Sequence, residues 1–250
     1  MSITSYALFW AAGFGAGLLD AIAGGGGLVG LPVLLSSGMP PLAALGTNRL
    51  QSIAGETIAM IYFLRSGKLK LQSLAWCFLF VILGASIGTI AVQTIHNDVL
   101  TKIIPFILLS LILYSVFSRR LFVQQEKPRL SSLWFATIFG TAIGAYNGSF
   151  GPGTGAIWTS CFILFLALDA QQAIMRSKPV NIAGNLVSVF WFVLQGNVMY
   201  SVALTMSFGQ ILGASIGARL VLTRGKKFIQ VAFVIVVILM TLNLGLKAFF

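Results

Sequence analysis

Two glycine-rich breaks between apolar runs limit the possible folds of this sequence more than any other feature. The first is the run of four glycines at 24–27, which follows Asp20 and an apolar run at 6–23. The second is the segment 147–155, which has the same local setting in the second half. Glycine weakens a helix and lets the backbone bend tightly. In a bilayer, the freed N–H and C=O groups must be covered by protein or line a water-filled cavity. Each break therefore predicts a broken helix at a binding site.

The composition indicates a polytopic membrane protein. Hydrophobic residues make up 58% of the chain and charged residues 8%, with a mean hydropathy of +0.96, whereas soluble domains carry about 25% charged residues. The segment 1–23 lacks the basic part of a signal peptide, so we expect it to be retained as the first helix. The apolar runs lie at 6–23, 28–37, 50–64, 73–95, 99–118, 132–147, 155–168, 180–195, 199–222 and 228–250. We predict an all-α membrane protein with glycine-broken helices near the midplane.

The two halves of the sequence are copies of each other. The segment ILGASIG at 82–88 recurs at 211–217, an offset of 129 residues. The same offset pairs Arg49 with Lys178, and near the breaks it becomes 127 and pairs Asp20 with Asn147. Such self-similarity indicates an internal repeat. We predict a first repeat at 1–118, a cytoplasmic linker at 119–131 and a second repeat at 132–250, within one membrane domain.

The distribution of basic residues predicts the orientation. With the loop Arg65–Lys70 in the cytoplasm, 13 of the 16 basic residues fall inside, and Arg49, Lys102 and Lys247 fall outside, as the positive-inside rule requires. The net charge of +11 then reflects membrane loops and not a nucleic-acid surface. The loop at Gly67 and its partner at Gly196 would face opposite sides, so the repeats are predicted to be inverted. Whether the glycine-rich helix pairs span the membrane or are re-entrant stays open.

Two acidic residues lie within apolar runs, Asp20 and Glu56. A charge at membrane depth costs about 2.5–3.5 kcal/mol on the insertion scale, and it usually marks a pathway or a proton relay. The alternatives are a structural ion pair or an interfacial cap. We predict that Asp20 carries a coupling proton or stabilises the open backbone, and Glu56 is the second proton-coupling candidate. Asp169 is a candidate helix cap.

The segments 47–51 and 177–181 place one cation in each half, Arg49 and Lys178. Each cation precedes an apolar run, so we expect a helix N-terminus beside it, and helix N-termini attract anions. We predict that both cations bind an anionic substrate, with anchoring at the membrane interface as the alternative. The predicted substrate-binding residues are Asp20, Gly24, Gly25, Gly26, Gly27, Asn48, Arg49, Gln51, Asn147, Gly151, Gly153, Thr154, Ser177, Lys178 and Asn181.

Other features predict packing and not chemistry. The glycine pairs at 13 and 17, 84 and 88, and 213 and 217 favour close helix packing. Cys77 and Cys161 lie inside apolar runs and are expected to be packing residues. The glycines are not followed by the Lys-Ser/Thr of a phosphate-binding loop. With one histidine and no acidic cluster, we expect no catalytic residue, no metal site and no cofactor.

Taken together, these segments resemble the TauE/SafE (TSUP) family of membrane exporters. The resemblance rests on the segments 17–27, 45–51, 146–155 and 212–214 and covers nearly the whole chain. Many relatives carry Asp where this chain has Asn147, so a symmetric relay of two carboxylates is not expected. The resemblance implies transport of a small sulfur-containing anion, such as sulfite, a sulfonate, or a sulfoacetate-like or thiosulfate-like anion, without naming one.

We therefore predict a multi-pass secondary transporter of the cell inner membrane that exports such an anion and is not an enzyme. The alternatives are a passive anion channel and a membrane-embedded enzyme or assembly factor. An acid cluster, or a cysteine beside a base, would favour the enzyme, and the sequence has neither. The expected partners are the anion and the lipid bilayer, with no nucleic acid, and a homodimer is left open.

Overall fold

The computed structural model describes residues 3–117 and 127–249, and it describes side chains at 3–111 and 127–224. These residues form helices and no strand, which confirms the predicted all-α class. The predicted linker at 119–131 lies largely outside the described residues. In chain order the elements are α1 (Ile3–Ala23), α2 (Gly27–Ser36), α3 (Pro41–Arg65), η1 (Leu71–Leu74), α4 (Ala75–Gln93), α5 (Asn97–Phe117), α6 (Ser132–Phe135), η3 (Ala136–Gly140), α7 (Thr141–Ser149), α8 (Thr154–Leu166), α9 (Ala170–Leu194) and α10 (Tyr200–Phe249).

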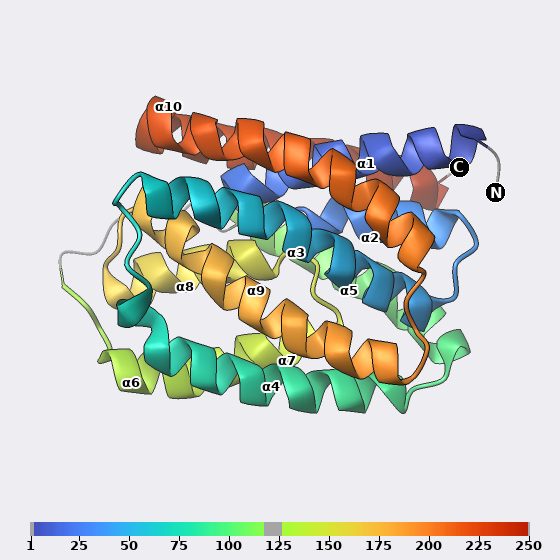
Figure 1. Cartoon of the computed structure of the whole chain (residues 1–250), viewed down its shortest axis with the longest axis horizontal. Coiled ribbons are helices and arrows are strands. Elements are labelled where there is room, and N and C mark those ends of the chain that lie inside the picture. The colour runs from blue at the N-terminus through green and yellow to red at the C-terminus, as the bar shows by residue number, and fades with distance from the viewer. Residues whose placement is uncertain (1–2, 118–126, 250) are drawn as a thin grey trace.

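The long helices lie in three layers (Figure 1). Helix α1 packs against α10 at one side, and α4 packs against α7 at the other side. Between them, α3 packs against α9, and each of these two also contacts a helix of an outer layer, α10 for α3 and α4 for α9. The short helices α2 and α8 follow the two glycine breaks. The middle layer therefore lies between two outer helix pairs, although part of α9, including Leu186 and Phe190, is exposed.

Close contacts between the outer helix pairs depend on glycine. A Cβ atom on Gly17 of α1 would overlap the backbone of Gln210 in α10, and a Cβ atom on Gly88 of α4 would overlap the backbone of Ala145 in α7. Small residues let helix backbones approach in this way inside a bilayer. The packing role predicted for the glycine pairs is confirmed at Gly13, Gly17, Gly84, Gly88, Gly213 and Gly217, which all face the backbone of a neighbouring helix.

One end of the layers, which we call the Lys68 end, collects the loop after α3 and the start of α9. Gln172 Nε2 donates to Lys68 O at 3.3 Å, and Gln171 Nε2 donates to Val221 O of α10 at 2.7 Å. Arg129 N also donates to Phe165 O, at 2.9 Å. The loop after α3, residues near 129 and the middle of α10 therefore lie together, at the left of Figure 1.

The opposite end, which we call the Asn197 end, holds the other connections. Asn197 Nδ2 donates to Gln93 Oε1 at 3.5 Å, and Leu42 N donates to Asn97 Oδ1 at 3.1 Å. The Gly67 and Gly196 loops, which the repeat pairs, thus lie at opposite ends of the helix layers (Figure 1). The inversion of the two repeats stays a prediction, as does the assignment of the Lys68 end to the cytoplasm.

Two helix boundaries differ from the prediction. Helix α3 begins at Pro41 and not near residue 50, and α9 begins at Ala170 and not near residue 180. Proline at the first position of α3, and Asp169 as the N-cap of α9, start these helices early. Asp169 Oδ1 accepts from Gln172 N at 3.0 Å, which confirms it as a helix cap. The polar residues predicted to lie in gaps therefore lie within helices. Helix α10 likewise continues through the gap predicted at 223–227.

Among the residues whose side chains the structure describes, three helical segments are long and apolar enough to cross a membrane, Ile3–Ala23, Leu71–Gln93 and Tyr200–Arg224. Helices α2 and α8 are shorter, with 10 and 13 residues. Cys77 and Cys161 are buried thiols in the apolar core, as expected for packing residues. The two central helices α3 and α9 carry the polar side chains that the next section describes.

Candidate functional site

Both predicted helix breaks are present, and their backbones touch. Helix α1 ends at Ala23 and α2 begins at Gly27, while α7 ends at Ser149 and α8 begins at Thr154. Gly24, Gly151 and Gly153 have φ values of +73°, +85° and +74°, which only glycine adopts readily. Ala156 N donates to Gly24 O at 3.2 Å. The contact joins the break of the first half to the helix that follows the break of the second half.

A small enclosed cavity lies between the breaks and the two central helices. Its lining comes from both halves of the chain and is almost entirely polar or glycine. The space that the centre of a water molecule can occupy is about 10 Å³, which is room for about one water. The cavity is lined by Asp20, Gly24, Gly27, Asn48, Arg49, Ser52, Glu56, Asn147, Gly151, Gly153, Thr154, Gly155, Asn181 and Asn185.

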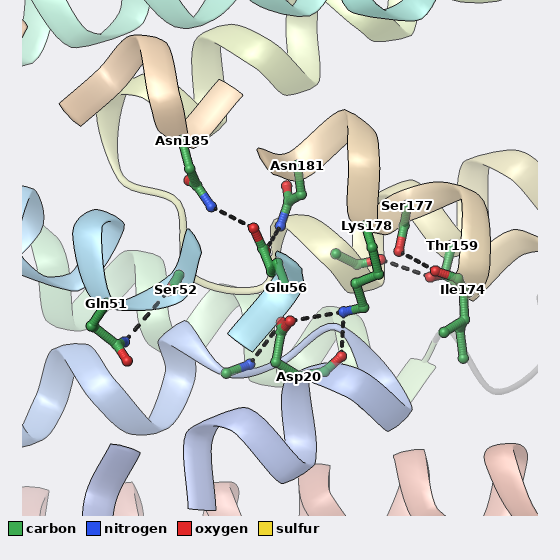
Figure 2. Close-up of polar contacts among 12 residues, drawn as sticks. Asp20, Gln51, Ser52, Glu56, Thr159, Ile174, Ser177, Lys178, Asn181 and Asn185 are labelled. Carbon is green, nitrogen blue, oxygen red and sulfur yellow. Dashed lines mark hydrogen bonds and ion pairs between the residues drawn. The ribbon is translucent and has the colours of Figure 1, made fainter. Parts of the chain in front are cut away.

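Asp20 and Lys178 form a buried ion pair beside this cavity (Figure 2). Lys178 Nζ lies 2.8 Å from Asp20 Oδ2 and also donates to the backbone oxygen of Asp20. The Lys178 side chain is 0% exposed and the Asp20 side chain is 10% exposed. Asp20 Oδ1 also accepts from Gly26 N at 3.4 Å. This contact supports the structural role predicted for Asp20 at the open backbone.

Arg49 is held by neutral oxygens. Its Nη1 atom donates to Asn147 Oδ1 at 2.6 Å and to Asn185 Oδ1 at 3.4 Å, and its Nη2 atom donates to Asn147 O. Its Nε atom is buried without a protein partner. The guanidinium group lies against Gly151, where any side chain would overlap it. The whole residue is 2% exposed, so a positive charge is buried here beside amide and carbonyl groups.

These two contacts exchange partners between the halves. Lys178 of the second half binds Asp20 of the first half, and Arg49 of the first half binds Asn147 of the second half. Under the repeat offsets the two contacts are equivalent, because Asp20 pairs with Asn147 and Arg49 pairs with Lys178. They differ in charge, since a carboxylate stands in one position and an amide in the other. One cation therefore has a carboxylate partner and the other does not.

Glu56, in the second half of α3, lies near the Asp20–Lys178 pair and is held by two asparagines of α9 (Figure 2). Asn181 Nδ2 donates to Glu56 Oε1 at 2.6 Å, and Asn185 Nδ2 donates to Glu56 Oε2 at 2.9 Å. Glu56 is 2% exposed. The repeat offset of 129 pairs Glu56 with Asn185, so equivalent residues of the two halves meet here. Asparagine amides can donate to a charged carboxylate and accept from a neutral carboxyl, so this pocket can hold either form.

The geometry around Arg49 favours an anion. Residues before and at the N-termini of α2 and α8, including Gly27 and Thr154, line the same cavity as Arg49. The N-terminus of a helix carries a partial positive charge and free N–H groups, which attract anions. A guanidinium group adds a full charge and paired donors.

Within the described side chains, no group of three His, Cys, Asp or Glu residues gathers as a metal site would require.

One part of the prediction for the two cations is wrong. Arg49 and Lys178 do not stand at helix N-termini; each is the ninth residue of its helix, α3 or α9. Both side chains are buried, so neither residue counts as a charge in a membrane loop. Without Lys178 and Arg49, the predicted distribution of basic residues becomes 12 on the cytoplasmic side and two on the outer side. Of these, Arg119, Arg120, Lys226, Lys227 and Lys247 lie outside the described side chains.

The structure brings most of the predicted site residues together. Asp20, Gly24, Gly27, Asn48, Arg49, Glu56, Asn147, Gly151, Gly153, Thr154 and Asn181 line the cavity, and Lys178 lies directly behind Asp20. Four other predicted residues do not line the cavity. Gln51 Nε2 donates to Asn48 Oδ1 at 3.0 Å, Ser177 Oγ donates to Ile174 O at 2.8 Å, and Gly25 does not line the cavity. Gly26 contacts Asp20 through its N–H group.

Three cavity residues were not predicted, Ser52, Gly155 and Asn185. The repeat could have identified two of them. Asn185 stands at the position equivalent to Glu56, and Ser52 at the position equivalent to Asn181, both at an offset of 129 residues. A neutral polar residue within an apolar helix costs less to insert into a bilayer than a charged residue. It is therefore a weaker indication of a functional site.

The fold and the site define a class: a helical membrane protein with a buried cation and broken helices around an enclosed polar cavity, as in membrane transporters. The chain belongs to the TauE/SafE family, since the family described as "Sulfite exporter TauE/SafE" matches residues 9–244. A "Probable membrane transporter protein" of Haemophilus influenzae is 39% identical over 96% of this chain and 94% of its own length. "Probable membrane transporter protein YfcA" of Escherichia coli K12 is 35% identical over 92% and 85%. No solved structure matches the chain.

Proposed function

We propose that this protein is a secondary transporter that exports a small sulfur-containing anion across the cell inner membrane. The observation that carries the proposal is the buried guanidinium group of Arg49, whose side-chain partners are amide oxygens. An oxyanion at this position would supply the missing negative charge and accept hydrogen bonds from the guanidinium group. The family description, which names a sulfite exporter, supports the sulfur chemistry and the direction of transport.

The positive charge and the hydrogen-bond donors around the cavity suit a small oxyanion, but the cavity in this structure is too small to hold one. Two helix N-termini and Arg49 face it, and the one ion pair among the described residues, Asp20 with Lys178, is already balanced. Room for about one water excludes sulfite, so the substrate requires movement of the surrounding helices. The breaks before α2 and α8 supply glycine positions at which the backbone can change direction.

Glu56 is the better placed of the two predicted proton-coupling residues. Its carboxyl group is held by two amides, which suit both protonation states, whereas Asp20 already balances the charge of Lys178. The charged side chains that face Glu56 are Asp20 from α1, Lys178 from α9 and Arg49 from α3. With Glu56 protonated, the three others leave one net positive charge for an anion. We therefore propose that the proton and the anion share this centre.

A transport assay with the purified protein tests the proposal. Proteoliposomes loaded with sulfite, thiosulfate or a sulfonate such as sulfoacetate are diluted into labelled anion, and counterflow is measured against chloride. A carrier gives saturable counterflow with one or more of the sulfur anions, whereas a passive channel gives flux without accumulation. Absence of flux with all three anions would overturn the proposed substrate class.

Substitution of the cation tests the site itself. We expect Arg49→Gln to lower the flux at least tenfold, while Arg219→Gln, an exposed residue that contacts Tyr62 Oη, leaves it unchanged. Glu56→Gln should retain counterflow and lose the response of the flux to an imposed pH gradient. If Asp20→Asn, and not Glu56→Gln, abolishes that response, the coupling role belongs to Asp20. Normal flux in Arg49→Gln would remove the guanidinium group from the site.

A further inference from the structure

A row of polar side chains leads from the central cavity to the Asn197 end. Ser188 follows Asn185 by one helical turn on α9. Thr89 Oγ1 of α4 lies 3.0 Å from Ser188 Oγ, and Gln93 Nε2 donates to Thr89 O at 3.2 Å. Asn197 Nδ2 then donates to Gln93 Oε1 at 3.5 Å. We call Ser188, Thr89, Gln93 and Asn197 the polar row.

The inner part of the polar row contacts the backbone beside the Arg49 partner. Thr89 Oγ1 also lies 3.1 Å from Gly148 O, and Gly148 directly follows Asn147, which binds Arg49. Thr89 and Ser188 are fully buried, whereas Gln93 and Asn197 are partly exposed. The polar row therefore runs from the site to the surface and is closed at its inner members.

Three of the four equivalent positions in the other half are apolar, and the fourth, the equivalent of Asn197 at the surface, is the exposed Lys68. The offset of 129 residues pairs Ser188 with Ala59, Thr89 with Ala218, and Gln93 with Leu222. Ala59 and Ala218 are both 0% exposed, and they belong to an apolar cluster towards the Lys68 end. That cluster includes Ala21, Phe63, Ile174, Met175 and Val221.

This difference between the halves is informative because buried hydroxyl groups are costly unless they are hydrogen-bonded. The alanine pair shows that the same kind of helix contact can be made without polar groups. Helix packing alone therefore does not require Ser188 and Thr89 to be polar. The polar row contains hydroxyl and amide groups and no carboxylate, which suits the passage of a hydrated anion.

We propose that the polar row is the route between the anion site and the Asn197 end, and that it opens when α4 separates from α9. The apolar cluster around Ala59 and Ala218, together with the Asp20–Lys178 pair, closes the Lys68 end in the structure described. The inference rests on the proposed function, since it gives the route of the anion that binds at Arg49. In this proposal, the opening toward the Asn197 end lies at the contact between α4 and α9.

Cysteine labelling tests the route with a matched control. In a variant whose two cysteines are replaced by alanine, Thr89→Cys and Ser188→Cys are compared with Ala218→Cys and Ala59→Cys. The probe is sulfonatoethyl methanethiosulfonate, an anionic thiol reagent that does not cross membranes, and Gly196→Cys reports its access to the Asn197 side. We expect cysteines at 89 and 188, labelled from that side, to react at least tenfold faster than those at 218 and 59 labelled from the Lys68 side. An excess of a sulfonate such as sulfoacetate, which does not react with the probe, should slow the reaction.

Each outcome decides the inference. Equal rates at the polar row and its alanine counterparts, or faster labelling of the row from the Lys68 side, would overturn the route. Variants that do not fold are replaced by Gln93→Cys, labelled from the Asn197 side, and Leu222→Cys, labelled from the Lys68 side, each partly exposed near its own end, and the cysteine at 93 is expected to react faster. Labelling does not depend on measured flux. If the wild type transports none of the sulfur anions but the row reacts as expected, the substrate class fails and the route stands.

Discussion

The ion pair between Asp20 and Lys178 allows a quantitative test of how the two halves hold together. We expect Lys178→Met to leave the Asp20 carboxylate in a buried position with no cation beside it. Lys178 is 0% exposed and the Asp20 side chain is 10% exposed, so solvent compensates little of the lost contact. Removing one partner of a buried pair costs about 3–5 kcal/mol, whereas replacing both partners can be nearly neutral.

The second substitution separates the charge from the packing. Asp20→Asn retains an oxygen that can accept from Gly26 N, a contact of 3.4 Å in the native chain, but carries no charge. The double variant Lys178→Met/Asp20→Asn should therefore recover about 2 kcal/mol or more of the stability that Lys178→Met loses. A coupling energy of this size is within the range that contacting residues show in double-mutant cycles.

The free energy of unfolding is measured in mixed micelles, with an unfolding detergent titrated against tryptophan fluorescence. Lys102→Met on α5 is the control, because Lys102 is exposed and its loss should change stability by less than about 0.5 kcal/mol. A loss below about 1 kcal/mol in Lys178→Met would refute the reasoning. So would a double variant as unstable as the single one, because the buried carboxylate would then not be the cause.

Three further predictions concern packing, topology and the asymmetry of the site. Gly17→Ala should destabilise the protein by about 1–3 kcal/mol, because the added Cβ overlaps α10, and the same titration measures it. The control is Gly15→Ala, whose added Cβ has no atom within 4 Å. It should leave the stability unchanged or raise it by up to about 1 kcal/mol. Reporter fusions should place Lys70 in the cytoplasm and Gly196 outside, and the same side for both would contradict the inverted repeat. Asn147→Asp should lower the affinity for the anion at least tenfold in binding titrations, because its carboxylate would occupy the neighbouring guanidinium group; unchanged affinity would place the anion elsewhere.

The sequence predicted the equivalence of residues better than their contacts. The repeat offsets paired Arg49 with Lys178 and the two glycine breaks with each other, and the structure places all of them around one cavity. Which cation binds Asp20 depends on how one half is placed against the other. The offsets do not contain that information, so the pairing of Asp20 with Lys178 could not be predicted.

The helix starts were mispredicted for a related reason. The segments before Arg49 and Lys178 contain polar residues, which indicate a loop in a chain that faces lipid on all sides. Here Asn48 and Ser177 face other helices and are 2% and 1% exposed, so polarity was compatible with a buried helix. A hydropathy pattern describes the contact with lipid, and it fails where a helix is surrounded by protein.

The narrow cavity has a consequence for the speed of transport. A pore that stays open can pass ions by diffusion, but on the proposed function a site with room for about one water must be rebuilt for each anion that crosses. Collective helix movements of this kind take microseconds to milliseconds. The turnover number of this protein is therefore limited to about 10³–10⁶ per second by those rates. Flux should level off at high anion concentration and should fall steeply on cooling.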